Sequence, residues 1–512
     1  MRGWIALLLG VVALGCATQP VLTPDSRFAA NDGLVVLRVV SNLEYPGWYR
    51  LTLKADGSTD SFQLNPVPYA VQGSYVFAAL LPQGLYTPDQ LLGGRNEGSY
   101  VYQVTAPLTT QLGTFRVEPG RVTNLGTLVY QPGTKLDKQG SQFWVALDPT
   151  PAPARELLRA HYANLAEAVS GKPELGWASQ RAVAERPAIL SAARASARAL
   201  NGAVVTPGNT VYAGGRLGQV FVGPELGSRW LRLDTGSVHE LLCVLPLGDG
   251  RILAGGEEGL LVYSQDGGKA WRPVALAHPN EMVSYLAAAP DRTLYLVAES
   301  ETDTVIYTSS DPAAGWHELK RFGPLPEGSL WWGPQSWKEK RTPSGATLRA
   351  QPYALTARAL FVLRQPKTIY RYDLQERRWD ESDSAPAPIF SIETTGDGYL
   401  FAIPVGGLKM FGSPDGGKTW QSREYFALHV PPAFADRDHG YMAALPYGLT
   451  QSWRTMKTTD GGSSWTESGK LPANTYAERL VLDPSGKKLI ALTPSHQLYV
   501  SSDDGQTWLG PR

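Results

Sequence analysis

Net charge and cysteine are both scarce in this sequence of 512 residues. The 47 lysine and arginine residues balance the 47 aspartate and glutamate residues, so the formal net charge is zero. A protein that binds a nucleic-acid duplex needs a concentrated basic surface to displace counterions, and this composition gives no support for such a function. The sequence has two cysteines, and no spacing of cysteine and histidine predicts a zinc site. We therefore expect no metal, no cofactor and no nucleic-acid partner.

The N-terminal apolar stretch, from Trp4 to Leu14, is too short to span a bilayer as a helix, which needs about 20 residues. It follows the positive charge of Arg2 and has the length of a signal peptide. The stretch ends in ALGC, which resembles the lipobox of bacterial lipoproteins, although Ala13 stands where that motif usually has leucine. The resemblance implies that residues 1–15 are a signal peptide and that the thiol of Cys16 is lipidated.

The chain after Cys16 is polar and contains proline, so we expect residues 16–33 to form a lipidated tether. Residue 17 is alanine rather than aspartate, which favours the outer membrane. The expected location is the bacterial cell envelope, with the lipid as the sole attachment to the membrane. The alternative is an ordinary cleaved signal beside an incidental cysteine. If Cys16 is lipidated, Cys243 has no disulfide partner, and its context LLCVLP predicts a buried strand.

A short motif recurs through the second half of the chain. Four copies are complete or nearly so, SQDGGKAW, SPDGGKTW, TTDGGSSW and SSDDGQTW, and three are degenerate, GPELGSRW, SSDPAAGW and YDLQERRW. Each copy ends in a tryptophan, and these are Trp230, Trp271, Trp316, Trp379, Trp420, Trp465 and Trp508. Their successive intervals are 41, 45, 63, 41, 45 and 43 residues. A period of about 40–45 residues is the length of one four-stranded blade, so the repeats predict a seven-bladed β-propeller over residues 203–512.

The motif resembles the Asp box, or bacterial neuraminidase repeat, which forms the tight turn between the third and fourth strands of a blade. The aspartate accepts hydrogen bonds from backbone N–H groups, a glycine supplies a positive φ, and the tryptophan packs on a neighbouring strand or blade. These roles are structural, and we expect no catalytic residue in the boxes. The residues assigned to them are Asp266, Trp271, Asp311, Trp316, Asp415, Trp420, Asp460, Trp465, Asp503 and Trp508.

The whole chain is predicted to be all-β with a short helical linker. Segments such as LVVLRVV and SYVFAALLPQGLY predict a small antiparallel β-sandwich over residues 34–135. Its LPQGLY and FRVEPGRVTNLGTLVY stretches resemble prealbumin-like modules of bacterial surface proteins. Residues 150–202 are the predicted helical linker, packing on the side of the propeller. One amphipathic helix is predicted there from the stripe of Leu158, Tyr162, Leu165 and Val169.

In propellers, the loops between the second and third strands share one face with the connections between blades, and ligands bind there or in the central channel. The 63-residue interval places an insertion on that face, roughly residues 323–345. The insertion carries the aromatic and cationic side chains of Trp331, Trp332, Trp337, Lys338 and Arg341. These side chains would suit binding to a glycan or a protein surface, unless the tryptophan rings fold back onto the rim of the propeller. Other candidate residues on this face are Arg216, Glu257, Glu258, Glu299, Arg364, Trp453 and Arg454.

Propellers with Asp boxes include sialidases, xyloglucan hydrolases, sortilin-type receptors and the photosystem II assembly factor, and AGGEEGLLVYSQDGGKAW most resembles the last. The Phe-Arg-Ile-Pro motif of sialidases is missing, since the nearest stretch is ERP at residues 185–187. We therefore expect a non-catalytic propeller that binds a protein or glycan partner. The alternative is a secreted glycoside hydrolase, whose two acids, about 5–10 Å apart, would come from Glu257, Glu258, Glu299 and Asp303.

Overall fold

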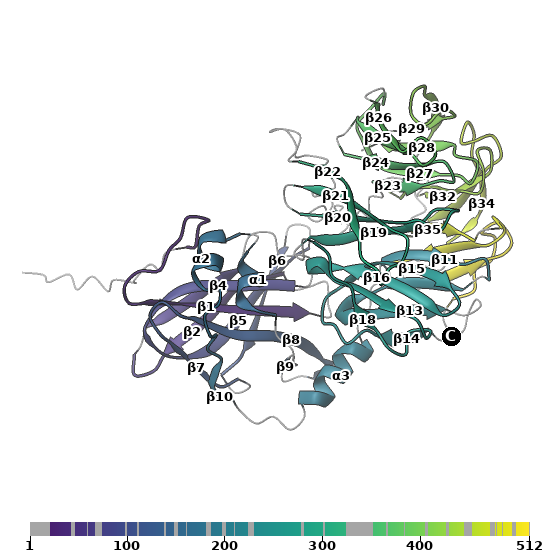
Figure 1. Cartoon of the computed structure of the whole chain (residues 1–512). Helices are drawn as coiled ribbons and strands as arrows, with labels where there is room; N and C mark the ends of the chain where they lie inside the picture. The colour runs from purple at the N-terminus through teal and green to yellow at the C-terminus, as the bar shows by residue number, and fades with distance from the viewer. Residues whose placement is uncertain are drawn as a thin grey trace, which may run out of the picture.

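The structure, a computed structural model, contains an N-terminal β domain and a β-propeller, with helix α3 (Arg186–Ser196) between them (Figure 1). The residues it describes are 21–41, 47–58, 60–66, 74–97, 100–109, 112–137, 140–147, 152–159, 161–180, 186–196, 201–208, 210–223, 230–277, 281–300, 303–323, 352–364, 367–382, 385–404, 408–425, 430–444, 453–471, 477, 479–483, 485–493 and 498–510.

The N-terminal domain is one nearly closed sheet in the spatial order β10-β7-β5-β2-β3-β4-β1-β8-β9, with β6 paired to β5. Its strands are β1 (Asp32–Ser41), β2 (Gly47–Ala55), β3 (Ser61–Pro66), β4 (Ser74–Pro82), β5 (Gly84–Glu97), β6 (Tyr100–Pro107), β7 (Thr114–Val117), β8 (Val122–Asp137), β9 (Gly140–Leu147) and β10 (Trp177–Ser179). Strand β3 pairs with both β2 and β4 and so joins the two halves. The predicted all-β class is confirmed, but β1 and β8 run parallel, so the sheet is not purely antiparallel.

Both faces of strand β1 are buried. Successive side chains of a strand point to opposite faces. The face toward the domain interior carries Val35, Leu37 and Val39. The outer face carries Leu34, Val36, Arg38 and Val40. All seven are buried, so LVVLRVV reads as a nearly continuous apolar run interrupted by one arginine.

The helical segment holds two short helices where the sequence predicts one. Helix α1 (Ala154–Leu158) and helix α2 (Ala163–Ala168) are separated because Tyr162, which precedes α2, has φ −132° and ψ 61°, outside the helical region. The predicted stripe is nevertheless buried, against the outer face of β1 at Leu34 and Val36. Helices α1 and α2 therefore cover the N-terminal sheet and not the side of the propeller.

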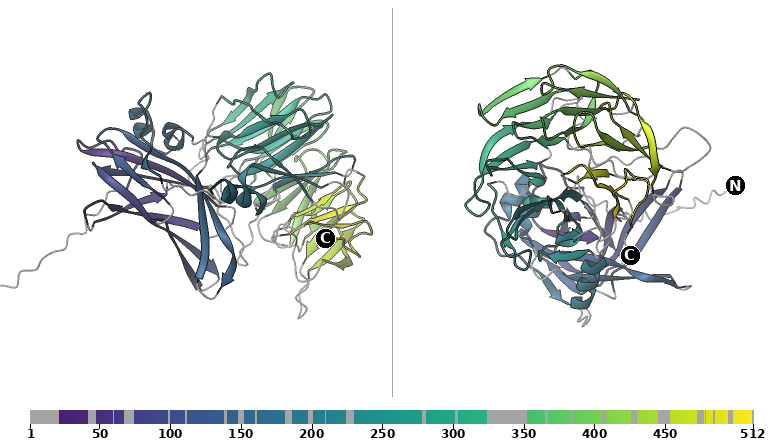
Figure 2. Two further views of the ribbon diagram at one scale, coloured as in Figure 1. Left: turned by 90° about the horizontal axis from the view of Figure 1, so that it is seen from below. Right: turned by 90° about the vertical axis from the view of Figure 1, so that its right-hand side faces the viewer.

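The propeller consists of seven antiparallel sheets, or blades, arranged in a ring (Figure 2). Blade 1 contains β11 (Asn201–Val205), β12 (Val211–Gly214), β13 (Gln219–Gly223) and β14 (Leu231–Asp234). Blade 2 contains β15 (Leu241–Gly248), β16 (Arg251–Gly256), β17 (Leu261–Ser264) and β18 (Arg272–Pro273). Blade 3 contains β19 (Met282–Ala288), β20 (Leu294–Glu299), β21 (Thr304–Ser309) and β22 (His317–Phe322).

The remaining blades follow the same order along the chain. Blade 4 contains β23 (Tyr353–Leu355), β24 (Ala359–Leu363), β25 (Ile369–Asp373) and β26 (Arg378–Ser382). Blade 5 contains β27 (Ile389–Thr394), β28 (Leu400–Pro404), β29 (Lys409–Ser413) and β30 (Gln421–Glu424). Blade 6 contains β31 (Ala433–Phe434), β32 (Gly440–Ala444), β33 (Arg454–Thr458) and β34 (Thr466–Lys470). Blade 7 contains β35 (Arg479–Leu482), β36 (Leu489–Leu492) and β37 (Leu498–Ser501), and its outer edge is a single bridge between Val500 and Leu509.

The repeat motif lies where the tryptophan spacing predicts, at the turn between the third and fourth strands of each blade. In five blades the tryptophan directly precedes the fourth strand, in blade 7 it precedes the bridge residue Leu509, and Trp379 of blade 4 is the second residue of β26. The ring closes by apolar packing of blade 1 against blade 7, with Ala203 and Phe221 in one core with Ile490 and Val500. The seven-bladed propeller predicted from the sequence is confirmed.

Candidate ligand-binding face of the propeller

The two faces of the ring differ in what forms them. We call loop face the side formed by the loops between second and third strands, among them the 3-10 turns η1 (Arg216–Gly218) and η2 (Glu257–Gly259). We call turn face the opposite side, which carries the repeat turns. The N-terminal domain lies behind the ring when the ring is viewed along its axis (Figure 2, right), and it touches the loop face at blades 1 and 2.

An apolar core joins the two domains at this contact. Val40 of β1 and Val129 of β8 pack with Ala193 of α3 and with Leu217 and Val238 of the propeller. Helix α3 is also fixed to blade 1 by Arg194, which donates to the carbonyl of Gly236 at 2.9 Å and pairs with Asp234 at 3.2 Å. Part of the predicted ligand face is therefore covered by the protein's own N-terminal domain.

Arg38 enters the propeller beside this core. The guanidinium forms an ion pair with Glu258 of η2, and its Nη1 lies 3.3 Å from Nε2 of His239, in the connection between blades 1 and 2. Only 1% of the Arg38 side chain is exposed, against 31% for Glu258. Burial, and next the positive charge of Arg38, lower the pKa of His239 to about 4, so this imidazole is neutral near pH 7.

The neighbouring predicted residues are enclosed in the same region. One Glu257 carboxylate oxygen accepts the backbone N–H of Glu240 at 3.1 Å, and Glu240 pairs with Nε of Arg216 at 3.6 Å. Burial, and next the carboxylate of Glu240, raise the pKa of Glu257 well above its usual value. The structure thus brings the predicted residues Arg216, Glu257 and Glu258 together, but Glu258 binds Arg38 of the N-terminal domain, and Arg216 and Glu257 are buried in contact with Glu240.

Two other predicted residues hold the ends of the insertion. Glu299, at the end of β20, accepts hydrogen bonds from Ser284 at 3.0 Å and from the hydroxyl of Tyr353. Arg364, after β24, donates to the carbonyl of Gly323 and to the hydroxyl of Thr304. Both side chains are buried. Gly323 and Pro352 are the described positions nearest to the two ends of the insertion, and Tyr353 follows Pro352, so the described chain on either side of the insertion is fixed at blades 3 and 4.

The remaining candidates lie on blade 6 or outside the described residues. Trp453 is partly buried in the core between blades 6 and 7, and Arg454, at the start of β33, pairs with Glu467 at 3.1 Å. The insertion residues that the sequence singles out, and the proposed lipidation site, lie outside the described residues: Trp331, Trp332, Trp337, Lys338, Arg341 and Cys16.

The acids considered for a hydrolase are all engaged by other groups of the protein. Glu257 is buried, Glu258 is paired with Arg38, and Glu299 accepts two hydroxyl groups. Asp303 lies 3.1 Å from Arg321, which also binds Glu281. A glycosidase needs two carboxyl groups free to act as acid and as base or nucleophile on one sugar. In this structure each of the four acids is instead buried or bound to another group of the protein.

Sequence reasoning missed the polar groups of the inner strands. Burial raises the pKa of Glu393, on β27, to about 7, and Arg479 on β35 opposes this shift. Burial also raises the pKa of Tyr285, on β19, and its ring packs 5.8 Å from that of Tyr353. The signal was present in IFSIETT, where a glutamate interrupts an inner strand, but the strand pattern alone does not say that its neighbours bury it.

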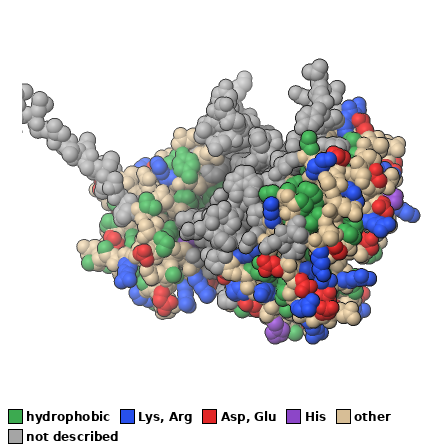
Figure 3. All heavy atoms as spheres, turned by 90° about the horizontal axis from the view of Figure 1, so that it is seen from above, with side chains coloured by type: hydrophobic (Ala, Val, Ile, Leu, Met, Phe, Trp, Pro, Cys, Tyr) green, Lys and Arg blue, Asp and Glu red, His purple; other side chains and the backbone are tan. Residues whose placement is uncertain are grey.

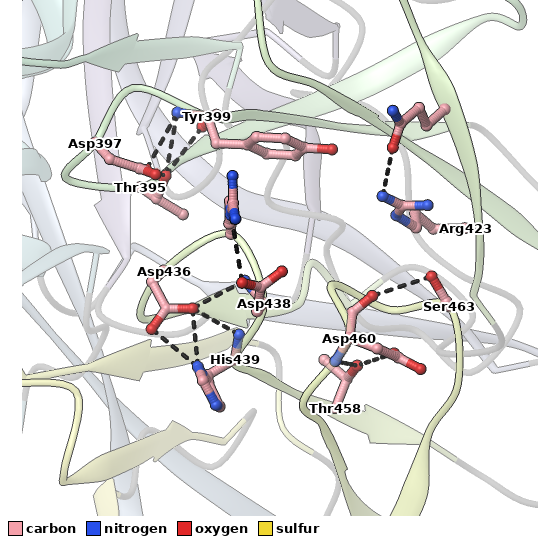
Figure 4. A network of polar contacts seen from close by, with 12 residues as sticks. Thr395, Asp397, Tyr399, Arg423, Asp436, Asp438, His439, Thr458, Asp460 and Ser463 are labelled. Atoms are coloured by element: carbon pink, nitrogen blue, oxygen red, sulfur yellow. Dashed lines mark hydrogen bonds and ion pairs between the residues drawn. The ribbon is translucent and has the colours of Figure 1, made fainter.

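The turn face is built from repeated hydrogen bonds that stay within the blades. In blade 6, Asp460 accepts from Thr458 at 2.8 Å (Figure 4). It also accepts from the N–H and hydroxyl of Ser464 at 2.9 and 2.7 Å. Hydrogen bonds from Ser464 lower the pKa of Asp460 to about 2. The N–H of Gly461 then donates to the carbonyl of Asp438, which braces the repeat turn against the first turn of the blade.

The same geometry recurs in the other complete repeats. Asp266, Asp415 and Asp503 each accept a hydroxyl two residues earlier and a backbone N–H four residues later, at 2.7–2.9 Å. In blade 4, Asp373 replaces the missing aspartate by accepting the N–H groups of Gln375 and Glu376. These contacts hold the turns together within each blade.

A depression of about 420 Å³ opens on the turn face between the first turns of blades 3, 4 and 5. Its walls are mostly small side chains: Ala288, Ala289, Pro290, Leu355, Thr356, Ala357, Thr394, Thr395 and Gly396. Within the described part of the chain, no group of three or more histidine, cysteine or acidic residues is placed to hold a metal ion. No described helix is long and apolar enough to cross a membrane.

The fold and the loop-face contacts define a seven-bladed propeller docked on an N-terminal β domain. No protein-family model matches the sequence. A xyloglucanase from Paenibacillus sp. is 30% identical over 107 residues, which cover 18% of this chain and 10% of the xyloglucanase. The chain thus spans about a tenth of the length of that curated relative.

Solved structures of other propellers align with low scores. YCF48 bound to D1 peptide aligns with a TM-score of 0.43 and 15% identity, over 59% of this chain and 92% of that chain. YCF48 from Cyanidioschyzon merolae aligns with a TM-score of 0.41 and 14% identity, over 55% and 88%. No family membership follows from these figures.

Proposed function

We propose that this chain is an envelope-anchored, non-catalytic propeller that binds a protein or glycan partner on its loop face. The lipid on Cys16 is its attachment to the membrane. The observation that supports the binding proposal is the anchoring of the described chain on either side of the insertion, by Arg364 at Gly323 and by Glu299 at Tyr353. A loop whose roots are fixed by buried polar groups can present its side chains from a defined position.

The composition of the insertion indicates the kind of partner. Three tryptophans offer flat apolar area, and the adjacent cations add attraction for an acidic glycan or protein surface. The insertion runs SLWWGPQSWKEKR and supplies Trp331, Trp332, Trp337, Lys338 and Arg341. In the view of Figure 3, charges of both signs are mixed over the described surface, so a local feature such as this loop supports selectivity better than the overall charge does.

The position of the N-terminal domain restricts where a partner can bind. Blades 1 and 2 are in contact with β1 and α3 through Arg38 and the core around Leu217. The loop face of the other blades remains for the partner. It begins at the insertion and includes Arg454 on blade 6, whose side chain is 13% exposed.

A hydrolysis assay separates this proposal from the hydrolase alternative. We expect no release of reducing sugar from xyloglucan and no release of sialic acid from sialyllactose, because the four candidate acids are occupied by protein contacts. Release of either product by the wild type, and its loss in Glu258→Gln, would replace the binding proposal with a hydrolase.

An affinity capture tests the binding proposal itself. Immobilised full-length protein is incubated with detergent-solubilised envelopes from the bacterium that encodes it, and retained proteins and glycans are identified. A second column carries Leu231→Ala, which removes an exposed apolar side chain from blade 1, away from the insertion. We expect one species enriched on both columns and saturable in titration. No saturable species on either column would count against a partner.

A further inference from the structure

The burial of Arg38 requires a compensating site on the propeller. A buried guanidinium without partners strongly destabilises the folded state, so such a charge is retained only where acceptors are prearranged. Strand β1 places Leu34 and Val36 under α1 and α2, and two residues later the same face reaches the propeller. Arg38 is 1% exposed at that point and contacts His239 and Glu258, both from the propeller.

The loops that receive it share an unusual backbone conformation. Leu217 of η1 and Glu258 of η2 occupy equivalent positions in blades 1 and 2, and their φ values are 53° and 51°. This left-handed region is unfavourable for side chains other than glycine, and such strain gathers at binding sites. Both strained residues are the ones that meet the N-terminal domain, Leu217 in its apolar core and Glu258 in the ion pair.

Backbone hydrogen bonds hold the two loops in place around the arginine. The carbonyl of His239 accepts the N–H of Gly218, and the carbonyl of Glu240 accepts the N–H of Glu257, at 2.8 and 3.0 Å. Nδ1 of His239 and Oε1 of Glu257 are buried and have no hydrogen-bond partner within the described residues. Each of these two atoms can therefore take part in a further hydrogen bond.

We infer that His239, Glu257 and Glu258 form a guanidinium-binding socket on the loop face of blades 1 and 2, which the chain fills with its own Arg38. Filling the socket fixes the N-terminal domain over these blades and excludes a partner from them. The two terminal nitrogens of Arg38 reach different acceptors, Nη1 toward His239 and Nη2 toward Glu258. A lysine carries its donors on a single nitrogen and lacks the planar fork that places separate nitrogens at the two acceptors. The inference does not depend on the proposed partner.

Chemical rescue in the full-length protein tests the socket. Arg38→Ala should increase amide hydrogen exchange of β1 and of residues 237–241 at least tenfold. Methylguanidinium at low millimolar concentration should reverse most of this increase in a saturable way. Sodium and tetramethylammonium at the same concentration should not. Arg116→Ala, which removes an exposed arginine from β7 of the same domain, is the matched control and should leave exchange unchanged.

Two further variants keep the test decisive if Arg38→Ala does not fold. Arg38→Lys should retain less than a tenth of the wild-type protection at β1. Glu258→Gln should weaken protection and, combined with Arg38→Ala where that folds, abolish the rescue. Wild-type exchange in both Arg38→Lys and Glu258→Gln would overturn the inference. Equal rescue by sodium and methylguanidinium in Arg38→Ala would do the same.

Discussion

Removing one repeat-turn aspartate should destabilise the propeller without touching its loop face. Asp415 accepts the hydroxyl of Ser413 at 2.9 Å, the N–H groups of Lys418 and Thr419 at 3.1 and 2.8 Å, and the hydroxyl of Thr419 at 2.7 Å. Asp415→Ala loses all four contacts. The turn is exposed, and water replaces part of these hydrogen bonds. We therefore expect the free energy of unfolding to fall by about 1–2 kcal/mol, which is similar to the effect of removing a helix N-cap residue.

Urea and thermal unfolding followed by circular dichroism measure this loss, and the melting temperature should fall by roughly 2–4 °C. Lys418→Ala is the matched control, because it removes an exposed side chain and keeps the backbone N–H that donates to Asp415. The turn hydrogen bonds hold the pKa of Asp415 below its usual value. Its stabilisation is therefore present above pH 3.8 and disappears as pH falls through the lowered pKa, where variant and wild type should converge. Equal stability of Asp415→Ala and wild type at pH 7, or an equal loss in Lys418→Ala, would refute the structural role.

Two further predictions concern the inner strands and the anchor. Because burial raises the pKa of Glu393 from 4.5 to about 7, folding is favoured below pH 4.5 and weakened as pH rises through 7. The free energy of unfolding of the wild type should fall by up to about 3 kcal/mol between pH 5 and pH 8 because of this group. Urea titrations of Glu393→Gln should not show this pH dependence. The same pH profile in the variant and the wild type would contradict the prediction. Cys16→Ser should release the protein from membranes or leave the precursor uncleaved, and wild-type fractionation and mass in that variant would count against lipidation.

The fold was largely predictable because the repeat motif fixes both local and long-range structure. Each aspartate, glycine and tryptophan determines one turn, and the constant spacing of the tryptophans determines the number of blades. Blade 4 shows the limit of pattern matching. Its turn is closed by Asp373, one residue before the motif position, which only the backbone geometry reveals.

The loop face was less predictable, because the sequence gives the side on which a residue lies but not what covers it. The charges of Glu257, Glu258 and Arg216 resemble a ligand site until β1 is placed beside them. The sequence did contain one indication of this contact, Arg38 in LVVLRVV. A charged side chain in a strand that is buried on both faces requires a partner. Nothing in the pattern says that the partner belongs to the propeller, 220 residues later at Glu258.

The insertion also resisted prediction in part. Its length and composition indicate a binding loop, whereas the roles of Glu299 and Arg364 at its roots depend on contacts with Tyr353 and Gly323 that sequence spacing does not specify. Both residues carry charges of the kind that contacts ligands. In the structure both are buried and bind protein groups instead.

The affinity of the captured partner for Trp331→Ala plus Trp332→Ala tests the central claim most directly. Truncation of hot-spot aromatics typically costs about 2 kcal/mol or more, roughly thirtyfold in affinity. Biolayer interferometry should therefore show binding at least tenfold weaker than for wild type and for Leu231→Ala, with a melting temperature close to that of wild type. Retained affinity together with a large fall in melting temperature would show that the two rings are packing groups, and would contradict a partner held by the insertion.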